Sequence, residues 1–248
     1  MEAIYILWLR QLKRYVRSRS RIIGSLGQPL LFLFALGFGF GPIFQKAGQG
    51  NYIQFLAPGI IAMSILFTSI FSGIEIIWDR QFGFLKETLV APVPRWQIML
   101  GRTFGGATVA SIQGLIVLCI SLVAGFKPQN LPMLILAFFI IFLIAVLFTA
   151  LGTAIASLLT DMQGFQLIMN FLIMPLFFLS AALFPLNGIP KFLKVIISLD
   201  PLTYGVDGLR GTLTGLNHYN LTLDFAVLII LSVLLTLLGS YLFSKIEI

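Results

Sequence analysis

The stretch from Glu75 to Arg102 holds the densest group of side chains in this sequence that could do polar chemistry. Basic and acidic residues alternate along it, whereas the rest of the chain is dominated by apolar residues. The charged residues are Arg80, Lys86, Arg95 and Arg102 with Glu75, Asp79 and Glu87. Apolar segments long enough to span a membrane flank the stretch on both sides. The pattern indicates a polar surface that a membrane protein presents to water.

The sequence lacks the residue patterns with which soluble enzymes hold phosphates or metals. It has no GxxxxGK[ST] phosphate loop, and no cysteines or histidines have metal-ligand spacing. Cys119 is the only cysteine, so no disulfide framework is expected. His218 is the only histidine, and we interpret it as a loop residue. We therefore expect no catalytic residue, no metal and no cofactor in this chain.

Composition indicates an integral membrane protein. Apolar residues make up 58% of the 248 residues and charged residues 10%, whereas soluble domains contain about 25% charged residues. Because a helix needs about 20 apolar residues to cross a bilayer, this length allows roughly five to seven spans and no separate soluble catalytic domain. The net charge of +7 is explained by Lys and Arg on cytoplasmic loops, so no nucleic acid partner is expected.

Six apolar segments predict an all-α membrane protein, because a helix satisfies its own backbone hydrogen bonds in lipid. The expected spans are about Ile22–Phe44, Tyr52–Ile77, Thr103–Gly125, Leu131–Leu159, a fifth that ends near Leu183, and Leu223–Phe243. We treat residues 1–248 as one transmembrane domain, which comprises an interfacial helix (1–21), spans one to five (22–183), an outer re-entrant hairpin (184–222) and span six (223–243).

The first 21 residues predict an amphipathic helix that lies on an anionic membrane surface. Its apolar stripe is Ile4, Leu7, Trp8, Leu12 and Tyr15, and its basic stripe is Arg10, Lys13, Arg14, Arg17 and Arg21. The charges follow the apolar residues, the reverse of a signal peptide, so no cleavage is expected. Six spans would place eleven of the 16 Lys and Arg residues on the side of the two termini. Both termini are therefore expected in the cytoplasm.

The longest non-spanning stretch, residues 184–222, predicts a broken helical hairpin on the outer side. It contains the amphipathic run Lys191–Leu199, then Asp200-Pro201, then the run TYGVDGLRGTL. Each run is too short to cross a bilayer, and a proline disfavours helical backbone at the residue before it. We expect two interfacial or re-entrant helices that meet at Asp200.

No ionisable residue lies well inside a predicted span, which argues against ion-coupled transport and leaves Glu75 as a proton-carrying acid as the alternative. Glu75 comes nearest, and we expect it to pair with Arg80 or Arg102 at the membrane interface. Energy for transport would then come from a partner subunit. Small residues in span three, from Gly101 to Gly114, predict close helix packing either within one subunit or between two.

Two motifs resemble the ABC-2 type permease family, the membrane subunits of ATP-binding-cassette exporters for drugs, lipids and polysaccharides. Residues 79–102, DRQFGFLKETLVAPVPRWQIMLGR, are similar to the first cytoplasmic loop of the family, whose pattern ends with a helix that closes on glycine plus a basic residue, here Gly101-Arg102. Residues 184–211 are similar to its outer segment ahead of the last span. Phe84 departs from the pattern, because Thr is common there. The resemblance covers essentially the whole chain.

The resemblance implies a permease that forms a homodimer or heterodimer and binds separately encoded ATPase subunits, which would hold ATP and Mg²⁺. A short helix at about 84–89 would dock in a groove of the ATPase and transmit its closure. The predicted ATPase-coupling residues are Asp79, Arg80, Gly83, Phe84, Leu85, Lys86, Glu87, Leu89, Pro92, Arg95 and Arg102. The predicted outer gate consists of Pro185, Pro190, Asp200, Pro201, Tyr204 and Arg210.

The expected function is the permease subunit of an ATP-driven exporter in a bacterial inner membrane, with spans one, two and five along the substrate path. The Phe-rich spans favour a hydrophobic or amphipathic substrate, such as a drug or a lipid. The sequence leaves three alternatives open, namely a permease for polysaccharides or lipid-linked glycans, a channel that uses no ATP, and a membrane scaffold that transports nothing.

Overall fold

The computed structural model of the chain describes residues 2–48, 50–129, 131–186 and 188–246. The predicted N-terminal helix, the connector at 126–130 and the outer hairpin each include one residue outside these ranges. The helices are α1 (Glu2–Arg17), α2 (Arg19–Lys46), α3 (Tyr52–Ser72), α4 (Ile74–Gln81), α5 (Phe84–Val90), α6 (Arg95–Val123), η1 (Leu131–Met133), α7 (Leu134–Leu158), α8 (Met162–Leu179), α9 (Lys191–Leu199), α10 (Pro201–Thr214) and α11 (Leu221–Ser244). Within the described ranges every regular element is a helix, as predicted.

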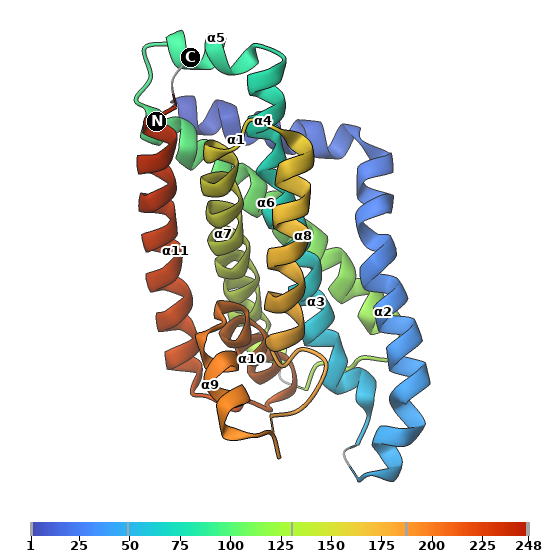
Figure 1. Cartoon of the computed structure of the whole chain (residues 1–248). Helices are drawn as coiled ribbons and strands as arrows, with labels where there is room; N and C mark the ends of the chain where they lie inside the picture. The colour runs from blue at the N-terminus through green and yellow to red at the C-terminus, as the bar shows by residue number, and fades with distance from the viewer. Residues whose placement is uncertain (1, 49, 130, 187, 247–248) are drawn as a thin grey trace.

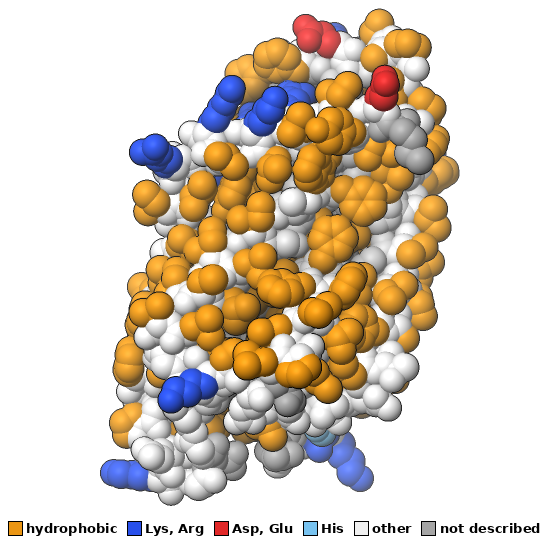
Figure 2. Space-filling view, turned by 180° about the vertical axis from the view of Figure 1, so that it is seen from behind, with side chains coloured by type: hydrophobic (Ala, Val, Ile, Leu, Met, Phe, Trp, Pro, Cys, Tyr) orange, Lys and Arg blue, Asp and Glu red, His pale blue; other side chains and the backbone are white. Residues whose placement is uncertain are grey.

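Six helical segments of the described chain are long and apolar enough to cross a membrane. They are Arg19–Lys46, Tyr52–Gln81, Arg95–Val123, Leu131–Leu158, Met162–Leu179 and Leu221–Ser244. Figure 1 shows them arranged as one bundle. On the face drawn in Figure 2, hydrophobic side chains cover the middle of the molecule and the charged side chains gather towards its two ends. The prediction of a six-span, all-α membrane protein is confirmed.

The two ends of the bundle differ in structure. Helices α1 and α5 lie at one end, which we call the α5 end (Figure 1). Both ends of the chain lie there too, as expected for an even number of spans. Helices α9 and α10 lie at the opposite end, which we call the α10 end (Figure 1). Helix α10 is buried along most of its length, whereas α9 exposes several large apolar side chains. The break between them lies at Asp200, where it was predicted.

The six spans differ strongly in the share of their residues that is buried inside the chain. In the most apolar 18-residue window of the α3–α4 span, 78% of the residues are buried, against 17% for α2 and for α11. Helix α3 therefore lies at the centre of the bundle, where it packs on α2, α6 and α7. Helices α2 and α11 leave most of their apolar side chains uncovered within this chain, which suits contact with lipid.

Small residues bring helix backbones into contact within the chain. A Cβ atom added at Gly152 of α7 would lie 2.5 Å from the carbonyl oxygen of Ile70 in α3. One added at Gly105 of α6 would lie 2.6 Å from Cγ of Gln11 in α1. Neither site has room for a larger side chain. The small residues of span three thus serve packing inside the subunit, which the sequence had left open.

The prediction for the start of span three was wrong. The sequence pattern placed the end of a helix at Gly101-Arg102 and the start of span three at Thr103, whereas α6 runs without a break from Arg95 to Val123. The charge of Arg102 is accommodated within the bundle, because Asp79 pairs with it inside the protein. Span three is consequently eight residues longer at its first end than predicted.

Candidate functional site at the α5 end

Helix α5 is a short helix held between two spans. Helix α4 ends at Gln81, and Gly83 follows in the left-handed region with φ of 82°, a conformation that glycine adopts without strain. The backbone then turns into α5 at Phe84. After Val90 the chain becomes extended, and Pro94 precedes the first residue of α6. The predicted helix at 84–89 is therefore present, between the predicted glycine and Pro92.

The two faces of α5 have different surroundings. Leu85 is 2% exposed and belongs to the main core, and Leu89 packs against that core. The opposite face leaves Phe84 51% exposed and Val90 78% exposed, and Lys86 and Glu87 are exposed beside them. Two further large apolar side chains next to the helix, Phe82 and Trp96, are also exposed. This end of the bundle thus presents a mixed apolar and charged surface.

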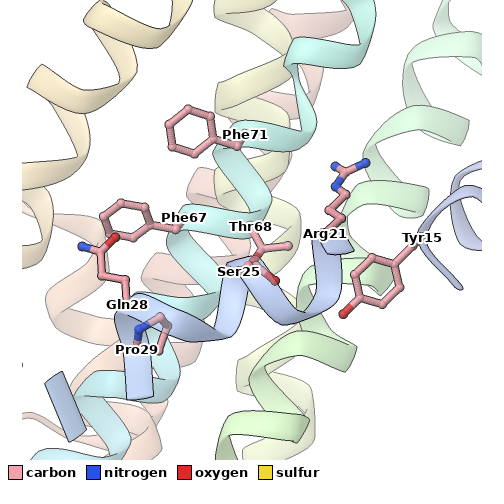
Figure 3. Close-up of a pocket in the computed structure, with 9 residues that line it drawn as sticks. Tyr15, Arg21, Ser25, Gln28, Pro29, Phe67, Thr68 and Phe71 are labelled. Carbon is pink, nitrogen blue, oxygen red and sulfur yellow. The ribbon is translucent and has the colours of Figure 1, made fainter. Parts of the chain in front are cut away.

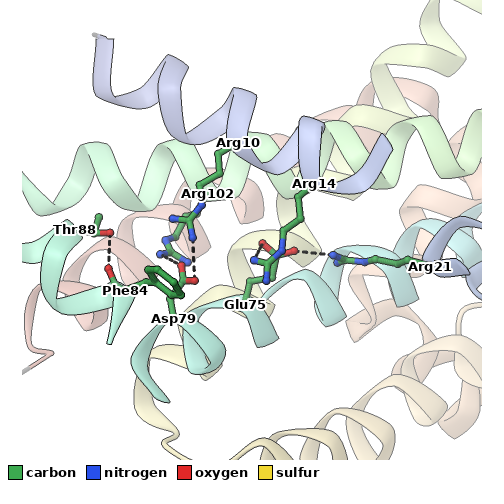
Figure 4. Close-up of polar contacts among 8 residues, drawn as sticks. All are labelled: Arg10, Arg14, Arg21, Glu75, Asp79, Phe84, Thr88 and Arg102. Carbon is green, nitrogen blue, oxygen red and sulfur yellow. Dashed lines mark hydrogen bonds and ion pairs between the residues drawn. The ribbon is translucent and has the colours of Figure 1, made fainter. Parts of the chain in front are cut away.

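Two buried carboxylates lie one helical turn apart on α4, and arginines of α1, α2 and α6 contact them (Figure 4). Asp79 accepts from Nη2 of Arg102 at 2.6 Å and from Nη2 of Arg10 at 3.1 Å. Glu75 accepts from Nη1 of Arg21 at 2.7 Å, and Nη1 of Arg14 lies 3.5 Å from its other carboxylate oxygen.

The partners of Glu75 correct a prediction. We expected Glu75 to pair with Arg80 or Arg102, but its ion pairs are with Arg14 and Arg21. The sequence does contain a signal for these ion pairs, which is the four-residue spacing that the arginines of α1 share with the carboxylates of α4. Arg10 and Arg14 are four residues apart on α1, as Glu75 and Asp79 are on α4, so each pair of side chains lies on one face of its helix and both ion pairs can form together. The sequence pattern predicted contacts of the α1 arginines with the membrane surface, and it did not predict their pairing with Glu75 and Asp79.

Arginines at this end also hold the last carbonyl groups of two spans. Arg80 donates from Nη1 to the carbonyl oxygen of Leu159 at 2.9 Å and from Nη2 to that of Ser157 at 3.1 Å, where α7 ends. Arg95 donates from Nη1 to Ser244 at 2.6 Å and to Ile246 at 2.8 Å, where α11 ends. The final carbonyl groups of a helix have no partner within it and favour positive charge, so both contacts stabilise helix ends.

The predicted coupling residues therefore fall into two groups. Residues engaged within the chain are Asp79, Arg80, Leu85, Leu89, Arg95 and Arg102. Residues left at the surface are Phe84, Lys86, Glu87 and Pro92, with Gly83 at the turn that positions them. The side chains of the second group can contact another protein without rearrangement of this chain.

The predicted outer-gate residues lie together at the α10 end. Asp200 Oδ1 accepts from the backbone amide of Leu202 at 2.9 Å and caps α10, with Pro201 at the first helical position. Tyr204 donates its hydroxyl to the carbonyl oxygen of Ser198 at 2.9 Å and so joins α10 to α9. Pro190 precedes α9, and Pro185 lines a cavity that Arg210 also lines.

A cavity of about 370 Å³ lies between α2 and α3, on the α5 side of the bundle. Figure 3 shows Phe67 and Phe71 of α3 across from Gln28 and Pro29 of α2, with Arg21 and Tyr15 at one end. Ser25 and Thr68 add hydroxyl groups to its wall. Burial raises the pKa of the Tyr15 hydroxyl, although the charge of Arg21 opposes this. The wall thus combines aromatic rings with a few polar groups, as small-molecule sites do.

The family model for the ABC-2 type transporter matches residues 2–214, which include every span before α11. This chain belongs to the ABC-2 type transporter family. Its membership agrees with the resemblance of residues 79–102 and 184–211.

Individual relatives align over nearly the whole permease. The ycf38 transport permease of Cyanophora paradoxa is 30% identical, over 99% of this chain and 89% of its own length. Nodulation protein J of Rhizobium leguminosarum bv. viciae is 27% identical, over 90% of this chain and 87% of its own. The inner membrane transport permease YadH of Escherichia coli K12 is 26% identical, over 92% and 89%. The chain is thus a multi-pass transport permease of this family.

Proposed function

We propose that this chain is the membrane subunit of an ATP-driven exporter, with the α5 end in the cytoplasm and with α5 as the docking helix for an ABC ATPase. The observation that supports this most directly is the exposed face of α5 around Phe84 and Lys86. It lies at the end of the bundle where Asp79 and Glu75 are buried in ion pairs with arginines, whereas Phe84 and Lys86 remain exposed. The ATPase would hold ATP and Mg²⁺, and two permeases would form the path.

Motion of α5 would reach the spans through its two flanking helices. Helix α4 continues α3, the central span, and α6 follows α5 after four residues. The buried pair of Asp79 and Arg102 joins α4 to α6 close to α5. A force on α5 would therefore move α3 and α6 together, and α1 with them through Arg10. This connection is the physical basis for the proposed coupling.

For the substrate we propose a hydrophobic or amphipathic molecule that enters through the cavity between α2 and α3. Phe67, Phe71 and Pro29 provide apolar area, and Gln28 and Thr68 provide hydrogen-bonding groups in the same wall. A flexible apolar molecule with one polar portion matches this lining. Bacterial inner membrane is the proposed location, in line with the name of the YadH relative.

The docking role is tested by a double substitution on the exposed face, Phe84→Asp with Lys86→Asp. A matched control, Phe192→Asp with Lys194→Asp, changes the same residue types on the exposed face of α9 at the opposite end. The tagged permease is purified together with its co-expressed ABC ATPase, and the retained ATPase is quantified. We expect about a tenfold loss for the α5 variant, because charge introduced into an interface is costly, and none for the control. Full retention by a folded α5 variant would refute the docking role.

A scaffold that transports nothing makes a different prediction for the same complex. In proteoliposomes that contain the permease and its ATPase, an exporter moves substrate only with ATP, and a channel moves it without ATP. A scaffold moves none, although it binds the ATPase normally. Flux of a fluorescent amphipathic dye, compared with and without ATP, separates the three.

A further inference from the structure

The described part of the chain forms a second cavity at the α10 end, of about 650 Å³. Its wall combines segments that are far apart in sequence, namely the end of α2, the start of α3, the connector before η1, the segment after α8, and α10 with its following loop. The converging polar side chains include Asn51, Gln129, Arg210 and His218. A cavity built from so many segments depends on the whole fold, unlike a crevice between neighbouring turns.

Arg210 is the central cation of this wall. It is 8% exposed, and it lines the cavity. Its Nη2 donates to the carbonyl oxygen of Ala181 at 3.1 Å and more weakly to that of Phe55 at 3.4 Å. The guanidinium lies 4.0 Å from the centre of the Phe55 ring, which fixes its plane. Two neutral acceptors and an aromatic ring position this side chain.

No carboxylate of the described residues pairs with Arg210. The four ion pairs found in the described ranges all lie at the α5 end. The Nε of Arg210 has no hydrogen-bond partner among the described residues, although it is buried. Burial lowers the pKa of Arg210 to about 10, against an opposing effect of Asp207, so the guanidinium is charged at neutral pH. A buried cation that forms no ion pair is costly, and an anion in the cavity could form one with it.

Asp207 lines the same cavity, and backbone amide groups hold its carboxylate in place. Its carboxylate accepts from the backbone amide of His218 at 2.8 and 3.0 Å and from that of Tyr219 at 2.7 Å. These bonds hold the loop after α10 against the helix and place His218 at the mouth of the cavity. Asp207 therefore shapes the site, and Arg210 supplies the positively charged group that an anion would contact.

Neutral donors and apolar walls complete the site. The side-chain nitrogens of Asn51, Gln129 and His218 donate to no residue in the described ranges, although all three residues line the cavity. Phe44 and Leu186 add apolar area nearby. Several donors around one guanidinium match the oxygens of a phosphate group, and the apolar walls match a hydrocarbon portion beside it.

We propose that the cavity at the α10 end binds the phosphate group of an amphipathic phosphate ester, with Arg210 as its principal ligand and His218 at its entrance. This site is independent of the ATPase-docking role proposed above, because it needs no partner subunit. Phospholipids and free phosphate share the recognised group, so the experiment has to separate these two sources.

Binding is measured on the purified, delipidated full chain in detergent by microscale thermophoresis. The probes are dihexanoyl phosphatidic acid, dihexanoylglycerol, which lacks the phosphate, and inorganic phosphate. We expect phosphatidic acid to bind at least about tenfold more tightly than dihexanoylglycerol, the scale of one hydrogen-bonded charge. Inorganic phosphate that binds as well as phosphatidic acid would identify free phosphate as the ligand, and weaker binding would identify the ester.

Two variants and one control assign the binding to this cavity. Arg210→Gln removes the central charge, and His218→Glu places a negative charge at the exposed entrance, where it leaves the core unchanged. Each should weaken phosphatidic acid binding at least about tenfold. Lys194→Gln removes an exposed charge of α9 at the same end and should leave binding unchanged.

The proposal is overturned if phosphatidic acid and dihexanoylglycerol bind equally to the unchanged chain, or if neither phosphate probe binds. It is also overturned if His218→Glu, which remains folded by thermal unfolding, binds phosphatidic acid as the unchanged chain does. The His218 variant decides the result if Arg210→Gln fails to fold.

Discussion

The Oδ2 atom of Asp79 lies 2.6 Å from the Nη2 atom of Arg102, and the two side chains are 5% and 3% exposed. The pair joins α4 to α6, the two helices on either side of α5. Arg10 contacts the other oxygen of Asp79 at 3.1 Å and adds α1 to the same junction. The ends of the α5 loop are thus fixed relative to each other inside the protein, while one face of α5 remains exposed.

Loss of one partner of this buried pair should destabilise the protein strongly. Asp79→Asn leaves Arg102 charged and buried without its carboxylate, which costs about 3–5 kcal/mol. The double change Asp79→Leu with Arg102→Met removes both charges and should recover most of that loss. Thermal unfolding in detergent micelles measures both, with Glu87→Gln on exposed α5 as the control. Equal stability of Asp79→Asn and this control would show that the pair contributes nothing.

Adjacent residues of α5 should respond differently to the same substitution. Leu85→Asp places a carboxylate at a position that is 2% exposed, and we expect a loss of several kcal/mol or a chain that does not fold, about the cost of an unpaired buried charge. Lys86→Asp changes an exposed side chain and should alter stability by about 0.5 kcal/mol or less. Unfolding midpoints of the two purified variants test this. Similar midpoints would mean that α5 does not pack as described.

Substitutions at Leu85 and Lys86 distinguish an effect on folding from an effect on ATPase docking. Loss of the ATPase from a Leu85 variant would be uninformative, because the loop itself would be disturbed. Exposed positions such as Phe84 and Lys86 report on the partner alone. The structure therefore changes which residues of the predicted coupling set provide a clean test.

Much of this fold could be predicted from local sequence. Apolar length identified the six spans, and turn-forming residues defined the short helices. Gly83 and Pro92 enclose α5, and the helix predicted at Lys191–Leu199 has these same bounds in the structure. In each case the deciding physics is local, because it depends on hydropathy or on the backbone preferences of glycine and proline.

Long-range polar contacts could not be predicted in the same way. Glu75 and Arg21 are 54 residues apart, and their contact depends on how α1 and α2 pack against the rest of the bundle. The packing of α1 in turn depends on Gly101 and Gly105, which let it approach α6. Arg210 was predicted as a gate residue from resemblance alone, and nothing in its sequence neighbourhood indicated that it would be buried without a carboxylate.

Close contact between α3 and α7 should make Gly152 intolerant of any side chain. The Cβ of Gly152→Ala would lie 2.5 Å from the carbonyl oxygen of Ile70 and 2.8 Å from its Cα, both backbone atoms, so the helices must separate. We expect a loss of about 1–3 kcal/mol, typical of overpacking. Gly39→Ala in α2 is the control, because its Cβ meets no atom within 4 Å, and it should gain about 0.5–1 kcal/mol from helix propensity. Thermal unfolding of the two variants compares them directly.

Asp200 should make the stability of the hairpin depend on pH. Burial raises the pKa of its carboxyl from 3.8 to about 7, and the hydrogen bond from Leu202 only partly opposes this. Between about pH 4 and pH 7 the folded chain therefore binds a proton that the unfolded chain has released. The free energy of unfolding must fall as pH rises through this window, and the loss is complete above about pH 7.

Asp200→Asn keeps an acceptor oxygen for the amide of Leu202 but cannot ionise. Its stability relative to the unchanged chain should therefore rise between pH 4.5 and pH 8, by on the order of 2–4 kcal/mol, because one pKa unit corresponds to about 1.4 kcal/mol. Unfolding midpoints at both pH values measure this change, and Asp161→Asn, at the exposed cap of α8, controls for loss of a capping carboxylate. A difference that stays constant or shrinks with pH would mean that Asp200 is solvated and charged in the folded protein, and that α10 enters the bundle less deeply than its burial indicates.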